Sequence, residues 1–218
     1  MQALRGKTEE FDIMVSVDDA IMRRRSVRKL QSCTVPDVVL EQVLLAAGWA
    51  PSAHNAQPWR FIVLVDPQLK RRLAEAMANA WAADMAKDGS TVAPETFKLR
   101  VERFATAPTL VLACLSMEGM IEFPDVERQR CERDLAVQSL AAALQNLLLT
   151  AHSLGLGACW FCAPVFCKGT VREVLEIPDE VEPEALIALG YPAEEPPFPP
   201  RKKLGDYCFK DRWGARFS

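Results

Sequence analysis

The residues best suited to chemistry in this sequence lie in a short polar loop and in a basic cluster. The loop, residues 51–58 (PSAHNAQP), carries Ser52, His54, Asn55 and Gln57 between two prolines. Proline fixes φ and lacks a backbone donor, so the loop should be stiff and should interrupt both helix and sheet. An apolar run, residues 59–65, follows at once and predicts a buried strand. Turn residues can simply satisfy their own backbone, but a rigid polar loop at the end of a core strand is also a usual place for a ligand.

The basic cluster, residues 23–29 (RRRSVRK), follows a short helix that we expect to begin after Ser16. Such a cluster can be a solvated surface, a nucleic-acid patch or a clamp for one phosphate. Ser26 places a hydroxyl among guanidinium groups, which suits a compact oxyanion better than bulk water. The phosphate clamp is therefore the interpretation that we carry forward.

Other catalytic patterns are absent from the sequence. The stretch GLGACW follows a predicted helix and carries only two glycines, so it is no dinucleotide-binding fingerprint. Walker, HExxH and serine-elbow motifs do not occur. His54 and His152 are the only histidines, so a catalytic triad or a metal centre built on histidine is not expected. If the protein is an enzyme, a bound cofactor should therefore supply the reactive group.

The seven cysteines leave two interpretations open. Cys159, Cys162 and Cys167 have the spacing C-x2-C-x4-C and, with Cys208, could supply four thiolates to zinc or an iron–sulfur cluster. The neighbouring aromatic residues instead indicate packed core, in which free cysteine acts as a small hydrophobe. An odd number of cysteines and an N-terminus without an apolar stretch predict a reducing, cytoplasmic setting. The lack of a long apolar run predicts no membrane span.

Composition indicates an ordinary globular chain. It has 218 residues, 50% hydrophobic, with a formal net charge of -3 and a pI near 5.6, which argues against a surface generally attracted to nucleic acid. We expect one domain over residues 1–218, with residues 196–218 as an extended, proline-rich tail.

Hydrophobic periodicity predicts helices separated by strands that do not alternate strictly with them, which indicates an α+β fold with a mixed sheet. The helices are expected at residues 17–24, 36–48, 67–87, 94–104, 129–154 and 170–175, and the strands at 59–65, 109–115, 157–162 and 185–189. The helix at 129–154 is apolar nearly all round, which is typical of a core or a subunit interface. Gln138 and His152 on it either reach solvent or line a cavity.

Four motifs in order, RRRSVRK, APSAHNAQPWRF, LGLGACW and RKKL, resemble the FMN-dependent nitroreductase family across residues 17–204. The resemblance implies a mixed, mainly antiparallel central sheet surrounded by helices. It also implies a domain-entwined homodimer with two FMN molecules at the interface.

Two further stretches, MEGMIEFPDVERQR and NLLLTAHSLGLGACWFCAPVF, resemble the reductase half of bifunctional enzymes that finish a deazaflavin hydride-carrier coenzyme. Those enzymes carry a γ-glutamyl ligase domain before the reductase. With only about sixteen residues ahead of the first helix, we expect a reductase module alone. Deazaflavin-coenzyme biosynthesis is therefore one expected role.

The family resemblance assigns the site residue by residue. Arg24, Arg25, Ser26 and Arg28, with Arg201 and Lys203, would hold the FMN phosphate and ribityl chain. Pro51, Ser52, Ala53 and Asn55 would reach the flavin from the other subunit, Gln138 would contribute to the pocket, and Trp160 and Phe161 would lie along the ring. The chain departs from the family at Leu30, where phenylalanine is common, and in its cysteine-rich turn, which leaves the contacts to the flavin nitrogen N5 open.

The implied activity is an NADH- or NADPH-dependent, ping-pong reduction of a flat, electron-poor acceptor such as a nitroaromatic, a quinone, a flavin or a deazaflavin precursor. Arg24 or Arg28 would place a cation near the reduced ring. A promiscuous reductase is the alternative within this class. The alternative from another class is a non-catalytic module that binds metal or nucleic acid.

Overall fold

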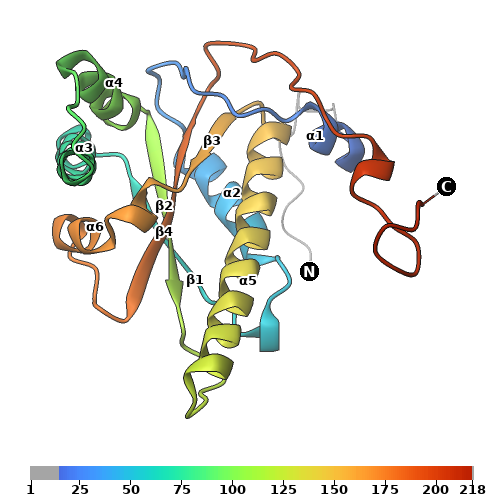
Figure 1. The fold of residues 1–218 in the computed structure, drawn as a ribbon. Coiled ribbons are helices and arrows are strands. Elements are labelled where there is room, and N and C mark those ends of the chain that lie inside the picture. The colour runs from blue at the N-terminus through green and yellow to red at the C-terminus, as the bar shows by residue number, and fades with distance from the viewer. Residues whose placement is uncertain (1–14, 218) are drawn as a thin grey trace, which may run out of the picture.

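The structure is a computed structural model that describes residues 15–217 of the chain. A four-stranded sheet carries helices on both faces (Figure 1). The strands are β1 (Trp59–Leu64), β2 (Thr109–Ser116), β3 (Gly157–Phe161) and β4 (Val181–Gly190), and the helices are α1 (Val17–Arg23), α2 (Asp37–Gly48), α3 (Pro67–Lys87), α4 (Pro94–Ala105), α5 (Val126–Ser153) and α6 (Lys168–Leu175). The α+β class is confirmed.

The sheet has the order β1-β2-β4-β3, and all three neighbouring pairs are antiparallel. The parallel component of the expected mixed sheet is a single bridge between Ser26 and Ala158 at the β3 edge. This bridge matters because it brings the basic cluster against a core strand.

The central strand β2 is buried along its whole length because helices cover both of its faces. Alternate side chains of a strand point to opposite faces. Val111, Ala113 and Leu115 pack in one core with residues of α2 and α5. Leu110, Leu112 and Cys114 pack in a second core with residues of α3, α4 and α6. The same division appears in Figure 1, where α2 and α5 lie on one side of the sheet.

Local capping residues set most helix boundaries. The Asp66 side chain accepts from the backbone N–H groups of Gln68 and Leu69, and Pro67 occupies the first turn of α3. Pro36 was expected to be the first helical residue of α2 but is its N-cap, so the helix begins one residue later, at Asp37. Helix α5 begins at Val126, three residues before the predicted start, because Asp125 accepts from the N–H of Arg128 and caps it. Helix α6 likewise begins at Lys168 instead of residue 170.

Strand β4 begins at Val181, four residues before the predicted start. Its register shifts so that Ala113 faces Ala185 while Cys114 faces Pro183, which leaves Glu184 outside the ladder. A bulge tolerates proline within a sheet. The side chains of Glu182 and Glu184 form ion pairs with Arg133 of α5 and Lys168 of α6, and we call these four residues the quartet. The N–O distances from Arg133 to Glu182 and Glu184 are 2.8 and 2.7 Å.

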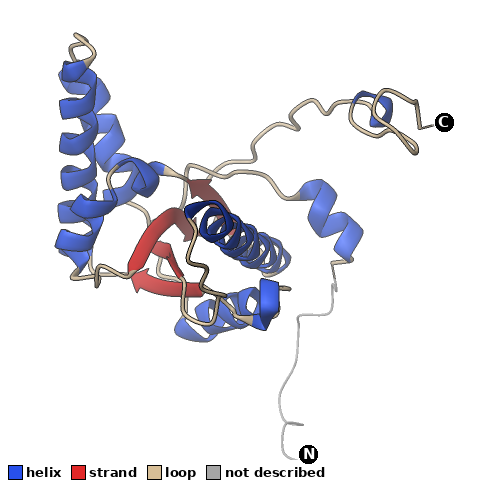
Figure 2. Ribbon diagram, turned by 60° about the horizontal axis from the view of Figure 1, so that its bottom comes forward, coloured by secondary structure: helices blue, strands red, loops and turns tan. Residues whose placement is uncertain are grey.

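Helix α1 and the C-terminal tail project away from the sheet and its helices (Figure 2). The tail from residue 196 is irregular at first, as predicted, and then turns through a short 3-10 helix at Leu204–Asp206. Its last turn is held by the rings of Phe209 and Trp213, whose centroids lie 4.7 Å apart. Within the described chain, none of the helices is both long and apolar enough to cross a bilayer.

Candidate functional site

The basic cluster is an extended segment fixed between two other parts of the chain. On one side, the Val27 N–H donates to the carbonyl of Ala158 in β3 at 3.0 Å. On the other side, the Ala193 N–H donates to the Lys29 carbonyl at 2.9 Å. The carboxylate of Glu194 accepts from the N–H groups of Arg28 and Lys29, at 3.1 and 3.2 Å. The backbone of this segment is therefore rigidly positioned.

Gly157 sets the distance between this segment and β3. A Cβ at position 157 would lie 2.9 Å from Cβ and Cγ1 of Val27, closer than side-chain carbons approach one another. The absence of a side chain at this position allows the two backbones to pack directly.

Several groups of the basic segment act on one buried thiol of β3. Burial raises the pKa of the Cys159 thiol, and the charges of Arg28, Arg103 and Arg24 and the Ser26 hydroxyl oppose that rise. Each of these groups therefore lies near the Cys159 thiol, and the backbone bridge between Ser26 and Ala158 places the segment along the β3 edge. Within the described residues, none of the three guanidinium groups pairs with a carboxylate. We call this set of three unpaired cations and one hydroxyl near Cys159 the basic cradle (Arg24, Ser26, Arg28 and Arg103).

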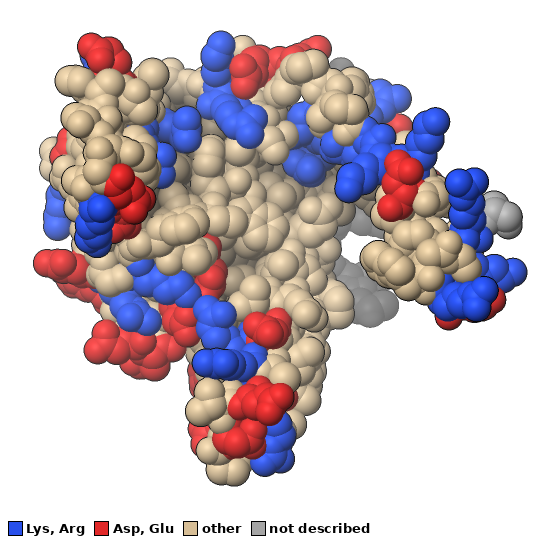
Figure 3. Space-filling model, viewed as in Figure 1, with Lys and Arg blue, Asp and Glu red and all other residues tan. Residues whose placement is uncertain are grey.

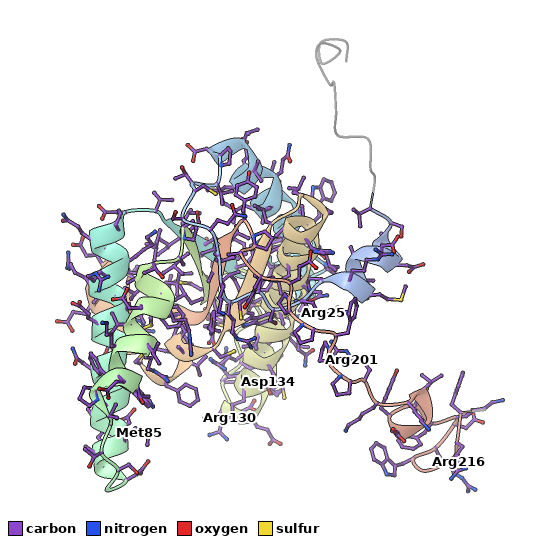
Figure 4. The ribbon with its side chains drawn as sticks, turned by 90° about the horizontal axis from the view of Figure 1, so that it is seen from above. Arg25, Met85, Arg130, Asp134, Arg201 and Arg216 are labelled. Carbon is purple, nitrogen blue, oxygen red and sulfur yellow. The ribbon has the colours of Figure 1, made fainter. Side chains whose placement is uncertain are left out.

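Arg25 points to the opposite face of the segment. Its Nη1 donates to the carbonyls of Met22 and Arg24 at 2.6 and 2.7 Å, and its guanidinium stacks 3.5 Å from the Phe198 ring centroid. Burial lowers the pKa of Arg25, as do the charges of Arg201 and Arg24. Figure 4 shows Arg25 and Arg201 near each other where the tail leaves the body. The side chain of Arg25 is thus engaged within the chain, apart from the even-numbered residues with which the sequence had grouped it.

A cavity of about 430 Å³ lies on this odd-numbered face, lined in part by Arg23, Arg25, Phe198 and His152. Burial lowers the pKa of His152, and the charges of the neighbouring arginines lower it further. The sequence left open whether Gln138 and His152 reach solvent or line a cavity. His152 lines this cavity, whereas Gln138 is exposed on α5.

The two aromatic residues of β3 differ in their surroundings. The indole Nε1 of Trp160 is buried and has no hydrogen-bond partner among the described residues, which is uncommon for a buried donor. The Phe161 ring packs edge-on against Phe104, with 5.1 Å between centroids, and the Arg103 guanidinium lies 5.7 Å from its centroid. The sequence reasoning missed Arg103 because its place beside β3 depends on how α4 packs.

The loop before β1 has a strained backbone. His54, Asn55 and Gln57 have φ values of 56°, 54° and 50°, in the left-handed region that non-glycine residues rarely occupy. The Ala53 N–H donates to Ser139 Oγ at 3.1 Å, and His54 Nε2 lies 3.3 Å from the buried carboxylate of Glu132. Residues held in such conformations cluster at functional sites, where surrounding contacts maintain them.

The basic cradle and this loop lie far apart within one chain. Ser139 of α5 contacts the loop, whereas His152 of the same helix lies beside the basic segment. Thirteen helical residues separate them, which span about 20 Å. The loop also directly follows an exposed apolar stripe on α2, formed by Val38, Leu45 and Trp49, which are 61%, 60% and 86% exposed.

The tail residues and the cysteines complete the candidate set. Arg201 and Lys203 are exposed, in the region where Figure 3 shows Lys and Arg side chains gathered near α1 and the tail. The Cys159 and Cys114 thiols are buried, and all seven cysteines are free. Over residues 15–217, no group of three or more His, Cys, Asp or Glu side chains is arranged to hold a metal ion.

Comparison with known proteins gives the class of this fold. The Nitroreductase family profile matches residues 21–191. The chain belongs to the nitroreductase family and is an oxidoreductase.

Individual relatives agree with this class. A protein of Methanothermobacter thermautotrophicus, named for NADH dehydrogenase and NAD(P)H nitroreductase activity, is 33% identical over 88% of this chain and 83% of its own length. An NADH dehydrogenase of Thermus thermophilus is 30% identical over 81% and 86%. A crystal structure of iodotyrosine deiodinase, bound to FMN and 3-iodo-L-tyrosine, is 25% identical with a TM-score of 0.66, covering 86% of this chain and 96% of that one.

Proposed function

We propose that the protein is an FMN-dependent oxidoreductase that takes electrons from NADH or NADPH and reduces a flat, electron-poor acceptor. The observation that carries the proposal is the basic cradle, in which Ser26 bridges to β3 and arginines without carboxylate partners lie near the neighbouring Cys159 and Phe161. A phosphate is a suitable counter-ion for this donor set. The family membership and the relatives named for NADH dehydrogenase and NAD(P)H nitroreductase activity support the same class.

In this proposal, Arg24, Ser26 and Arg28 bind the FMN phosphate, and Arg201 and Lys203 approach it from the tail. Trp160 and Phe161 flank the ring, and the buried Trp160 Nε1 offers an unused donor. When bound, the flavin supplies the chemistry by accepting two electrons as hydride and passing them on. The cations of the chain favour the reduced, more negative ring electrostatically. Because successive strand residues alternate, Trp160 on the α2 and α5 side of the sheet and Phe161 on the α3 and α4 side contact different parts of the ligand.

The site is completed by a second copy of the chain. The strained loop lies about 20 Å along α5 from the basic cradle, so one copy does not bring Pro51, Ser52, Ala53 and Asn55 to its own cradle. The exposed Val38, Leu45 and Trp49 stripe beside the loop is an apolar surface suited to a homodimer interface. Gln138 is exposed on the α5 face next to the loop and lies at the same interface. The whole chain, with its projecting tail, then acts as one FMN-binding domain.

The acceptor is a planar ring that follows NAD(P)H onto the same flavin face. The relatives reported above are named for NADH dehydrogenase, nitroreductase and deiodinase functions, and not for deazaflavin maturation. A dehydrogenated deazaflavin precursor therefore enters as one member of an acceptor panel, beside nitroaromatics, quinones and free flavins. Steady-state reduction of this panel with NADH and with NADPH assigns donor and acceptor.

A mixed-dimer experiment tests both halves of the proposal. Arg28→Ala and Asn55→Ala chains, carrying different affinity tags, are purified alone and as the co-expressed heterodimer. Each homodimer has two damaged sites, whereas the heterodimer has one intact site and one doubly damaged site. We expect the heterodimer to bind up to one FMN per dimer at wild-type affinity. A heterodimer no better than either homodimer contradicts a site shared between copies, and wild-type FMN binding by Arg28→Ala alone contradicts the cradle.

A further inference from the structure

A second cavity lies on the other face of the sheet, between α3, α4 and the short 3-10 turn η2 (Ala163–Phe166) that follows β3. Its volume is about 380 Å³, within the range of roughly 300–1,000 Å³ typical of small-molecule sites. Its walls include the apolar side chains of Met77 and Phe104. Met85, labelled in Figure 4, lines it near the far end of α3.

One cation of this cavity has no anionic partner. Among the described residues, Arg100 forms neither a salt bridge nor a side-chain hydrogen bond, and its guanidinium lies 4.1 Å from the Trp81 ring centroid. Burial lowers the pKa of Arg100, and the nearby charge of Arg103 lowers it further. A half-buried guanidinium fixed against an aromatic face can bind a carboxylate with both of its terminal nitrogens.

The rim of the cavity is aromatic and open. The Phe166 side chain lines it and is 83% exposed, so its ring is accessible to a ligand. Phe166 and the Trp81 ring therefore offer apolar surface for a planar ligand.

The opposite end of the cavity is acidic, which limits the ligand. Asp84 and Asp88 line this end. Asp84 is paired with Lys87 at 2.8 Å, whereas Asp88 has no cationic partner among the described residues. Asp88 follows Trp81 by seven residues, about 10 Å along α3. A second anionic group at that end of a ligand would be repelled.

The geometry points to a binding site for a planar aromatic monocarboxylate, with its carboxylate on Arg100, its ring between Trp81 and Phe166, and a neutral far end. This site is separate from the basic cradle. Arg103 lies one helical turn from Arg100, but it approaches Phe161 and Cys159 and does not line the cavity. The inference does not depend on the flavin.

Titration with 2-naphthoate, followed by calorimetry, tests the site, with 2-naphthol as a neutral compound that has the same ring system. Protein saturated with FMN and protein without added FMN are both titrated. We expect 2-naphthoate to bind both forms without releasing FMN, and 2-naphthol to bind about tenfold more weakly, because it lacks the charge-assisted pair.

Two variants and one control locate the binding. Arg100→Gln should weaken 2-naphthoate about tenfold while leaving 2-naphthol unchanged, and Phe166→Ala should weaken both. Lys98→Gln removes the same charge from an exposed position of α4 outside the cavity and should change neither. Unaltered 2-naphthoate affinity in Arg100→Gln, loss of binding on FMN saturation, or release of FMN by 2-naphthoate would each overturn the proposal. So would the absence of 2-naphthoate binding at millimolar concentration.

Discussion

Two clusters of positive charge in this protein are built in opposite ways. In the quartet, Arg133 and Lys168 each contact both Glu182 and Glu184, so two cations meet two anions. In the basic cradle, Arg24, Arg28 and Arg103 share a small region, and none of them pairs with a described carboxylate. The paired charges of the quartet attract one another and join elements of the fold. The unpaired cations of the basic cradle repel one another, and a bound anion would neutralise them.

Backbone conformation also differs between the regions that join the fold and the loop proposed to contact the ligand. The basic segment is held against β3 and the chain after Tyr191, and the quartet joins α5, α6 and β4 in regular structure. The loop proposed to reach the flavin from the other copy instead keeps three non-glycine residues in the left-handed region. Three of the five described non-glycine residues with positive φ thus lie in the loop proposed to meet the ligand, and the paired charges of the quartet lie where the fold is joined.

Replacing one cation of the basic cradle should have the largest effect on ligand binding. We expect Arg28→Ala to raise the Kd for FMN about 10- to 100-fold, which corresponds to one charge-assisted interaction with phosphate. Flavin fluorescence titration measures the change. Lys29→Ala removes the adjacent charge from the opposite face and serves as the control; an equal loss in both variants would mean that total charge, and not the cradle, attracts FMN.

Breaking the quartet should instead affect folding. Glu182→Gln leaves Arg133 and Lys168 with one anion between them, and we expect the free energy of unfolding to fall by about 1–2 kcal/mol. Urea denaturation at pH 7 gives this value. Glu180→Gln, at an exposed position near the start of the same strand, should change stability little. Unchanged FMN affinity in Glu182→Gln would sharpen the division between the two clusters.

The contribution of Glu182 should also depend on pH. The Arg133 guanidinium holds the pKa of Glu182 at about 2, below its usual 4.5, and Lys168 contributes to this shift. The folded state therefore binds this proton more weakly than the unfolded state does. The stabilisation is complete above pH 4.5 and is lost as the pH falls from 4.5 toward 2. The difference in unfolding free energy between wild type and Glu182→Gln should shrink over this interval, and a constant difference would argue against the quartet as its origin.

The smallest expected effect concerns the strained loop. Gln57→Gly places glycine at φ 50° and should raise the free energy of unfolding by roughly 0.5 kcal/mol, because relief of strain exceeds the added entropy of the unfolded chain. Ala56→Gly, at an ordinary φ of −69° in the same loop, should lower it by about 0.5–1 kcal/mol. Chemical denaturation of both variants makes the comparison. A loss of stability in Gln57→Gly would show that the left-handed conformation carries no strain.

The sequence predicted an element boundary correctly where neighbouring residues determine that boundary. The Asp66-Pro67 start of α3, the Pro94 start of α4 and the starts of β1 and β2 followed from caps, prolines and apolar runs. The start of β4 did not, because Glu182, Pro183 and Glu184 look unlike a strand. They become one through a bulge and through ion pairs with residues distant in sequence.

The candidate site shows the same limit. The basic cluster and the loop were identified from their residue types and spacing, but two details of the site were not. Arg25 was grouped with its neighbours, although the alternation of an extended segment turns it to the other face. Arg103 was missed because only the packing of α4 brings it beside Phe161. The alternation could have been applied to the sequence, whereas the packing of α4 could not.

Gly157 acts as a spacer for the whole edge that we propose binds the flavin phosphate. A single added methyl group would press on Val27 at 2.9 Å and displace the basic segment as a unit. Arg24, Ser26 and Arg28 would then lose their common alignment, although none of them is altered. The tolerance of this protein to sequence change should therefore be lower at a residue without a side chain than at several of the charged residues around it.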